Sequence, residues 1–332
     1  MRQVYGFSLI ELLISIALGV VLSSGMITVY LESKRNYAAE QELARIQENG
    51  RFAINLLKRE FSMAGFYGGY FITEDELNSV GLSDGGRDCV ESGNWALNLA
   101  APIEHINNFD NSWVTSSSTH LHGCVPKDTW VKSGSDIVTI KRTAGKATMF
   151  AGELVGVAKV ENSKYYLKVK NYGEFKQWFF SDSVVADFAA DFNELDEYWE
   201  FYSKIYYIRN WSVTVGDDVP VLCVRQLVRN NMFPADRCLV EGIEDMQIEF
   251  GIDSDGDHVP NRYTSELSDV SRVVTIRIFL LVRSLGELPG EKTTKTYVLG
   301  HDASEGTAMS DGYMRQLYST TVVAHNAAGP GK

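Results

Sequence analysis

An apolar run over residues 7–30 constrains this chain more than any other feature of its sequence. A helix of that length crosses a bilayer core of about 30 Å. Glu11 is the only charged residue between positions 7 and 31. An acid at the centre of a membrane helix costs about 2.5 to 3.5 kcal/mol on insertion scales, so an intramembrane carboxylate indicates a function.

A short leader, residues 1–6, precedes the apolar run, and Arg2 is its only charged residue. A secretory signal peptide has its small-residue cleavage site after the apolar segment. In this chain the small residue, Gly6, stands before that segment. The alternative to a processed leader is an uncleaved signal anchor that happens to contain one Glu.

The leader length and the spacing of Gly6, Phe7 and Glu11 resemble the start of type IV prepilins. The resemblance implies that a prepilin peptidase cuts between Gly6 and Phe7 on the cytoplasmic side and methylates the new N-terminal Phe7. It also implies that the apolar segment is retained, first as a membrane anchor and later as filament core. Glu11 would then meet the Phe7 amine of a neighbouring subunit, and a buried carboxylate is tolerated when a cation pairs with it.

The helical pattern continues beyond the membrane span. Apolar residues recur there at steps of three and four, and they are Leu43, Ile46, Ala53, Ile54, Leu57 and Phe61. No proline occurs in residues 1–101, and Gly65 and the Gly68-Gly69 pair mark the expected end. We expect five segments: a leader (1–6), a membrane and filament-core helix (7–30), its amphipathic continuation (31–66), a β-rich head (67–326) and a flexible tail (327–332).

The remainder of the chain alternates apolar and polar residues with the period of two that is typical of strands. The alternation is clearest around Val138, Tyr165, Met246 and Val274, and a last strand is expected over residues 317–324. Residues 72–135 are poorer in pattern and predict long loops with short elements. The predicted fold class is α+β, with a long N-terminal helix packed on a pilin-like head that contains an antiparallel sheet.

Composition narrows the functional classes. Acidic residues number 43 against 31 basic ones, for a net charge of −12, which argues against a nucleic-acid surface. We find no Gly-x-Ser-x-Gly, His-Glu-x-x-His or Gly-x-Gly-x-x-Gly motif, and we expect no enzyme and no required cofactor. The positive charges that flank the apolar segment do not predict its orientation across the membrane, because Arg2 lies on one side and Lys34 and Arg35 lie on the other. The N-terminus-inside orientation therefore rests on the prepilin resemblance.

The cysteines are even in number, as expected for disulfides in an exported protein. They are Cys89, Cys124, Cys223 and Cys238. Three pairings are open, and we favour Cys89–Cys124 and Cys223–Cys238 because each pair lies in one local region. No pair has the Cys-x-x-Cys spacing of a redox or zinc site.

An acidic loop offers the one candidate metal site. Asp253, Asp255 and Asp257 occupy alternate positions, and the Val259 carbonyl and the Asn261 side chain could complete an oxygen cluster for calcium. The segment resembles the calcium loops of thrombospondin type 3 repeats.

The same loop departs from an EF-hand. His258 stands at the sixth position, where Gly is wanted, and Thr264 stands at the twelfth, where Glu is wanted. The alternative is a polar turn, which Asp and Gly favour in any case.

Two further regions resemble the PilW-type minor pilins: residues 41–53 and 63–66 of the predicted helix, and the C-terminal stretches 280–284, 311–316 and 319–322. The resemblance implies a low-abundance pilin that primes type IV pilus assembly at the inner membrane and sits near the pilus tip. Implied partners are other minor pilins, the major pilin, the prepilin peptidase, the inner-membrane assembly machinery and a tip adhesin.

The implied location is the bacterial inner membrane, with a cytoplasmic N-terminus and a periplasmic head, followed by the extracellular pilus. Two alternatives stay open: a type II secretion pseudopilin, and a tip-located binding or adhesin module with a calcium-ordered loop.

Overall fold

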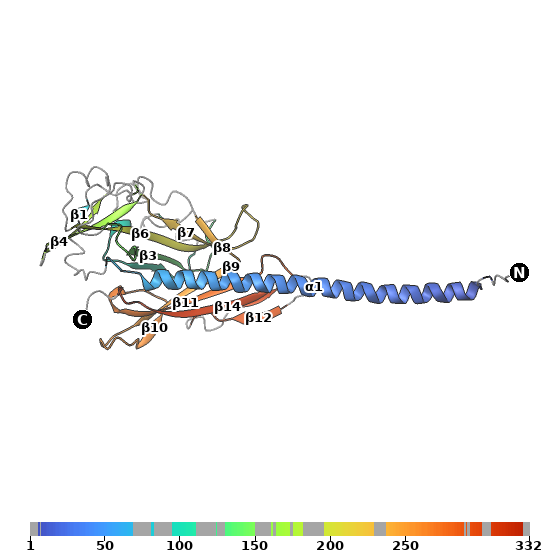
Figure 1. Ribbon diagram of the computed structural model, residues 1–332. Helices are drawn as coiled ribbons and strands as arrows, with labels where there is room; N and C mark the ends of the chain where they lie inside the picture. Colours follow the sequence, from blue (N-terminus) through green and yellow to red (C-terminus); the bar gives the residue numbers. More distant parts are fainter. Residues whose placement is uncertain are drawn as a thin grey trace.

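A single helix, α1 (Leu9–Ser62), runs through 54 residues and carries the head at its C-terminal end (Figure 1). The computed structural model describes residues 6, 8–68, 81–82, 95–110, 124, 130–149, 161, 164–172, 175–181, 196–228, 237–288, 290, 293–300 and 307–327. At 1.5 Å per residue α1 is about 80 Å long. The helix ends at Met63, and Gly65 follows with a φ of 75°, a conformation that glycine adopts without strain.

Strands make up most of the described head. They are β1 (Gly81–Leu82), β2 (Ile103–Ile106), β3 (Ile137–Thr143), β4 (Tyr165–Tyr172), β5 (Phe175–Ser181), β6 (Asp196–Arg209), β7 (Val221–Gln226), β8 (Arg237–Glu241), β9 (Ile243–Ile252), β10 (Arg262–Thr264), β11 (Val273–Arg283), β12 (Thr293–Tyr297), β13 (Thr307–Asp311) and β14 (Arg315–Val323). Two short 3-10 helices, η1 (Trp95–Leu97) and η4 (Val270–Arg272), complete the described elements.

The strands form two main sheets and a small ribbon. The larger sheet has the order β1-β5-β4-β6-β3-β2, with β7 beside β6 and β8 beside β7, and the second has the order β10-β9-β11-β14. Pairing between the described strands is antiparallel except for β1 with β5. The ribbon pairs β12 with β13. The predicted α+β class with antiparallel sheets is therefore confirmed.

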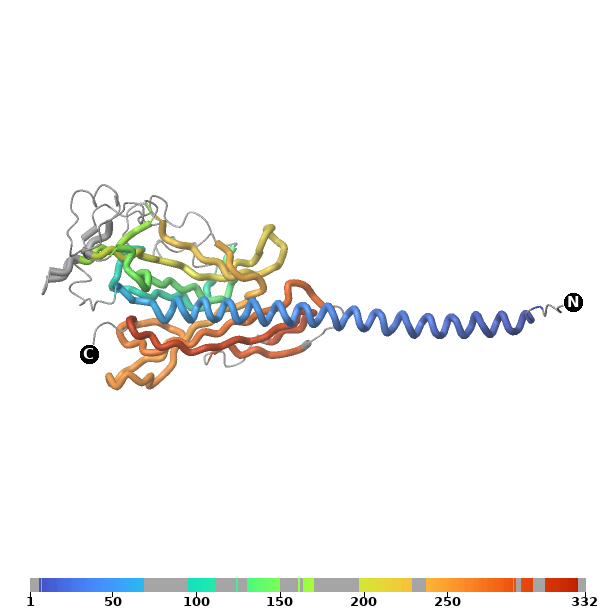
Figure 2. The backbone as a smooth tube through the Cα atoms, in the orientation of Figure 1, coloured from blue at the N-terminus to red at the C-terminus, as the bar shows by residue number. Residues whose placement is uncertain are grey.

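The C-terminal half of α1 lies between the two main sheets (Figure 2). One stripe of the helix is buried there: Ile46, Gly50, Ala53, Leu57, Glu60 and Phe61. This stripe shares a core with residues of β3, β6, β9, β11 and β14. Gly50 is needed at its position, because a Cβ there would lie 2.2 Å from the Tyr318 ring of β14.

The larger sheet is buried on both faces. Along β6, Tyr206 and Ile208 belong to the core around α1, whereas Ile205 and Tyr207 belong to a second core on the opposite face. The second core includes η1 and residues after β2. A strand covered on both sides explains why the run Ile205–Ile208 of β6 is continuously aromatic and aliphatic.

The strands expected from alternation are present at β3, β4, β9, β11 and β14. Two details differ from the sequence prediction. Leu43 continues the apolar stripe, but its side chain is 38% exposed. Ala327, the first residue of the expected flexible tail, is buried in the core around α1, and its N–H donates to the Ala324 carbonyl. Residues 328–332 of that tail lie outside the described residues.

A buried ion cluster fixes the last turn of α1 to the larger sheet. The Glu60 carboxylate accepts two hydrogen bonds from Arg142 of β3, at 2.8 and 2.9 Å, and one from Lys204 of β6 at 2.9 Å. Burial alone would raise the pKa of Glu60, but the hydrogen bond from Arg142 and the two positive charges lower it below its ordinary value. Burial lowers the pKa of Lys204, the Glu60 charge opposes this shift, and the neighbouring Arg142 charge adds to it.

We predict that Glu60→Gln destabilises the protein by roughly 3 to 5 kcal/mol, because it leaves two buried cations without a counter-charge. Urea unfolding of the detergent-solubilised chain measures the change. Glu48→Gln is the matched control, since Glu48 is exposed on the same helix and should change stability by less than about 0.5 kcal/mol. Equal effects of the two substitutions would contradict the assigned role.

The pKa of Asp245 on β9 shifts in the opposite direction to that of Glu60. Burial raises the pKa of its carboxyl to about 6, and the nearby Asp136 charge adds to the rise. Because the folded pKa lies above the usual 3.8, the folded state binds the proton more tightly than the unfolded chain does. This contribution favours folding at acid pH and is lost as the pH rises from about 4 to 6.

We predict that Asp245→Asn raises the free energy of unfolding at pH 7 by roughly 1 to 3 kcal/mol. The gain should shrink to near zero at about pH 3, where the wild-type carboxyl is mostly protonated in both the folded and the unfolded state. Unfolding curves at the two pH values test this. A gain that is the same at both values would show that charge burial is not its cause.

Candidate functional site

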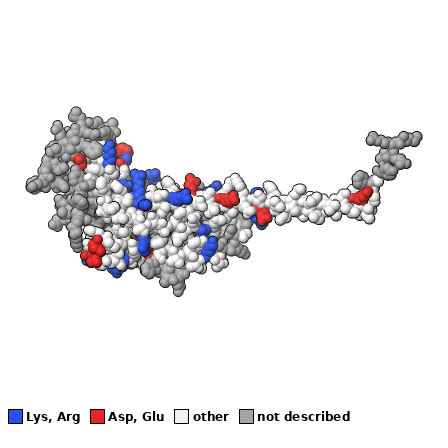
Figure 3. All heavy atoms as spheres, turned by 60° about the horizontal axis from the view of Figure 1, so that its bottom comes forward, with Lys and Arg blue, Asp and Glu red and all other residues white. Residues whose placement is uncertain are grey.

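The projecting half of α1 is the largest unpartnered surface of the described chain. Its large apolar side chains from Leu9 to Leu31 are between 48% and 78% exposed. An 18-residue window of the helix has a mean hydropathy of 2.3 and is 0% buried, so by length and composition it can cross a membrane. In Figure 3 this half is almost free of charged atoms except near its N-terminal end. Such a surface needs lipid or other helices around it.

Glu11 sits in the first turn of α1 and caps the helix. Its Oε2 accepts the backbone N–H of Ser8 at 2.9 Å. An acid at this position also interacts favourably with the positive end of the helix dipole. A carboxylate has four lone-pair sites, so one hydrogen bond leaves acceptor capacity for a cation.

The predicted processing site adjoins this cap. Gly6 is exposed, and a Cβ added to it would meet no atom within 4 Å. Phe7 and residues 1–5 lie outside the described residues. Cleavage between Gly6 and Phe7 and methylation of Phe7 therefore stay predictions.

Three of the four cysteines lie among the described residues of the head. Cys223 and Cys238 face each other across β7 and β8 and form a disulfide, which confirms that pairing. Cys124 is buried and is also disulfide-bonded, and its carbonyl accepts a 3.0 Å hydrogen bond from Arg225. Cys89 lies outside the described residues, so the Cys89–Cys124 pairing stays a prediction.

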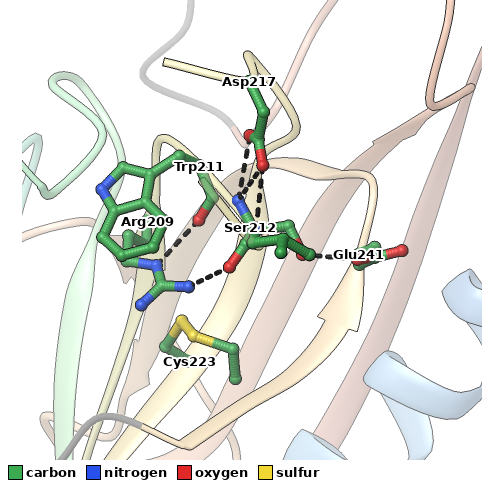
Figure 4. Close-up of a disulfide and its surroundings, with 8 residues drawn as sticks. Arg209, Trp211, Ser212, Asp217, Cys223 and Glu241 are labelled. Atoms are coloured by element: carbon green, nitrogen blue, oxygen red, sulfur yellow. Dashed lines mark hydrogen bonds between the residues drawn. A yellow bond between two sulfur atoms is a disulfide. The ribbon is translucent and has the colours of Figure 1, made fainter. Parts of the chain in front are cut away.

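The hairpin between β6 and β7 is held by a dense hydrogen-bond network that the sequence did not reveal (Figure 4). The Asp217 carboxylate accepts backbone N–H groups from residues 212–214 and 219. Burial opposes ionisation of Asp217, but these four donors outweigh it and lower the pKa to about 2. From the other side, Arg209 donates to the carbonyls of Trp211 and Ser212 at 2.7 and 2.5 Å.

This fixed hairpin presents two apolar side chains to solvent. Val213 is 82% exposed and Val215 is 68% exposed. Gly216 and Asp218 both have positive φ, at 88° and 55°, as a tight turn requires. The sequence signal for this turn is Gly216-Asp217-Asp218, and Gly and Asp are too common in turns for that signal to be specific.

The acidic loop joins β9 to β10, as the polar-turn interpretation requires. Ligand oxygens of Asp253, Asp255 and Asp257 all lie within 4.8 Å of one another. Asp253 accepts three backbone N–H groups, and these hydrogen bonds lower the pKa of its carboxyl. The Asn261 side-chain oxygen accepts two hydrogen bonds from Ser254.

The three carboxylates lie close enough together to serve as ligands of one metal ion, although Asp253 and the Asn261 oxygen already accept hydrogen bonds within the loop. The Val259 N–H donates to Asp257, and the Val259 carbonyl makes no hydrogen bond within the described chain. The structure gathers the carboxylates that the sequence singled out. It leaves the five-ligand set incomplete in this conformation.

A cleft of about 400 Å³ lies between α1 and the C-terminal strands. Its lining combines aromatic, amide and cationic side chains: Leu43, Gln47, Lys295, Tyr297, Tyr313, Met314, Arg315 and Gln316. Arg315 is held in the wall by Glu244 and Asp311, so its charge is neutralised within the head. The sequence could not show this cleft, because its walls come from three distant segments.

Comparison with known protein families agrees with this geometry. Residues 1–27 match the model of the prokaryotic N-terminal methylation motif, and residues 205–326 match the model of type IV pilus-assembly protein W. No curated protein and no solved structure gives a significant match. The first match covers the leader and the start of α1, and the second covers strands β7 to β14.

The methylation motif and the exposed apolar helix define the class, which is a membrane-anchored, prepilin-like protein. The second match gives the particular kind. Over residues 205–326 the chain is similar to type IV pilus-assembly protein W, so the two matches together relate it to pilins of the type IV pilus. Both matches point to a structural role rather than to catalysis.

Proposed function

We propose that this protein is a minor pilin that primes assembly of the type IV pilus and occupies its tip region. The observation that carries the proposal is the unbroken helix α1, half exposed and apolar and half locked into the head. The exposed apolar half of the helix is not covered by any described part of its own chain. We take it to be an assembly helix that is covered by lipid and then by the helices of other subunits. The minor-pilin role is what the resemblance to PilW-type pilins implies, and the match over residues 205–326 supports it.

The assembly step follows from the geometry of the helix start. A prepilin peptidase would remove residues 1–6 and leave a methylated amine on Phe7. Glu11 currently caps its own helix through Ser8, and in the membrane it would also accept the Phe7 amine of a neighbouring pilin. In low dielectric an ion pair of good geometry offsets much of the cost of burying either charge. Glu11 would thus set the axial register between adjacent subunits.

The partners we propose are other minor pilins, the major pilin, the inner-membrane assembly machinery and a tip adhesin. The head would face the periplasm, with a cytoplasmic N-terminus, before the protein enters the extracellular pilus. A pseudopilin of a type II secretion system shares the same leader and anchor. The match to type IV pilus-assembly protein W favours the pilus.

We predict that sheared surface filaments contain this protein with an N-terminal peptide beginning at methylated Phe7, as read by mass spectrometry. The Glu11→Ala variant should remain in the membrane, but its amount in the filament fraction should fall at least about tenfold. The reason is that an unpaired buried cation costs about 1.4 kcal/mol or more. Ser15→Ala on the next turn is the matched control. Processed protein confined to the inner membrane would favour the pseudopilin, and an intact leader would refute both.

A second proposal concerns the acidic loop, where the clustered carboxylates favour a calcium ion. Asp253, Asp255 and Asp257 would hold it, and hard cations prefer such oxygen ligands. The ion would tie the β9–β10 loop together. This would support an adhesin-like module at the tip.

We predict that calcium at 100 times its dissociation constant stabilises the full-length chain by about 2.7 kcal/mol. The melting temperature should rise by roughly 5 to 10 °C, and the fluorescence of nearby Tyr263 should change. Asp257→Asn should abolish both effects, while Glu266→Gln outside the cluster should keep them. Absence of both changes in the wild type at millimolar calcium would remove the site.

A further inference from the structure

The strand β14 forms one edge of the four-stranded sheet. It pairs with β11 over nine consecutive residues without a register shift. In the described part of the chain β14 has no second strand partner. Edge strands of this length are normally protected by charges, prolines or bulges, because their open backbone groups can pair with another chain.

The register shows which backbone groups point away from the sheet. At the two ends of the ladder, the Ser284 N–H donates to Met314 and the Ala324 N–H donates to Val274. Hydrogen-bonded residues alternate along an antiparallel ladder, so even-numbered residues of β14 face β11. The N–H and C=O groups of the odd-numbered residues therefore point outward.

Those outward residues are also the exposed ones. Leu317 and Val323 are 36% and 49% exposed, and Ser319 and Thr321 are exposed as well. The outward carbonyl of Arg315 accepts a hydrogen bond from Tyr297. Within the described residues, the outward groups of the other four make no hydrogen bond.

The edge has none of the usual protection. Residues 316–323 contain no charge, no proline and no glycine, and most are β-branched or aromatic types. The net charge of the whole chain is −12, so an uncharged, regular edge of this kind is a local exception. Its composition favours addition of a strand.

The direction of β14 restricts what can pair with it. Arg315 lies near Leu43 in the cleft, the Tyr318 hydroxyl donates to the Ile46 carbonyl, and the Asn326 carbonyl lies beside Gly65. The strand thus runs alongside α1 and in the same direction (Figure 1). Neighbouring subunits that are anchored by parallel helices keep their heads in the same orientation relative to the membrane. Strands that run along the helix in a neighbouring head are therefore parallel or antiparallel to β14.

A second copy of this chain is a poor antiparallel partner through the same four-stranded sheet. Antiparallel pairing of two β14 strands would turn one α1 end over end, and both helices could not then share one membrane. In the same sheet β10 runs opposite to β14, but it has only three residues. The four outward positions need a longer strand.

We propose that β14 is a docking edge on which the head of a different pilin-like subunit adds one antiparallel strand. The added strand would pair with residues 317–323 and extend the sheet across two heads. The inference rests on the proposed function, because parallel anchoring of neighbouring subunits supplies the alignment. It names a contact in the head, separate from the helix contacts of Glu11.

Cysteine cross-linking tests the pairing in membranes that contain the full-length chain and, one at a time, the other pilin-like subunits of its pilus. Ser319→Cys and Thr321→Cys are each combined with single cysteines along the partner's edge strands. For antiparallel pairing, moving two residues forward on β14 should move the best partner position two residues back. Cross-links that show no such shift, or that join only two copies of this chain, would overturn the proposal.

A backbone substitution gives an independent test. Ser319→Pro removes an outward N–H and keeps every hydrogen bond to β11, whereas Ser319→Ala keeps that N–H. Co-purification with the partner should fall about fivefold to tenfold for the proline variant and stay near wild type for the alanine variant. Equal losses would indicate a side-chain contact and overturn strand addition. If the proline variant does not fold, the cysteine register decides alone.

The outcomes separate this inference from the proposed function. Leader cleavage and the filament fraction report on the pilin role, whereas the register shift reports on β14. Processed protein in filaments without a register shift would refute only the docking edge. An unprocessed leader would refute the pilin role itself.

Discussion

One continuous helix divided between two environments is the constraint on which this structure depends. From Ile46 to Phe61 one face of the helix is buried between two sheets, and before Tyr37 the described residues of the helix are exposed. The buried half must be fixed firmly, since any movement at the head is amplified along a helix of about 80 Å. The Glu60, Arg142 and Lys204 cluster supplies that fixation at the last turn. Burying these charges is tolerated because each is paired with a charge of opposite sign, which offsets the cost of desolvation.

The head is assembled around the same helix. Sheet β10-β9-β11-β14 covers one side of it, and the larger sheet covers the other. Gly50 lets the Tyr318 ring approach the helix backbone, so β14 lies directly along it. This arrangement places an uncharged strand edge parallel to the anchor. The anchor and the proposed docking edge are therefore parts of one rigid geometry.

Two surface loops of the head are fixed in the same way, by a carboxylate that accepts several backbone hydrogen bonds. Asp217 gathers four backbone N–H groups in the β6–β7 hairpin, and Asp253 gathers three in the β9–β10 loop. Hydrogen bonds to an ionised carboxylate are stronger than neutral ones, so each loop is held without a hydrophobic core. The exposed valines 213 and 215 are displayed by such a fixed loop.

The sequence by itself determined the features that depend on local order along the chain. The leader, the apolar span and Glu11 are adjacent in sequence, and the period of two marked β9, β11 and β14 because side chains on a strand alternate between faces. Only the tertiary structure decided which strand lies at an edge and that Glu60 meets Arg142 and Lys204. Those outcomes depend on contacts between residues far apart in the chain, such as Glu60 with Lys204, and a single sequence carries no local signal for them.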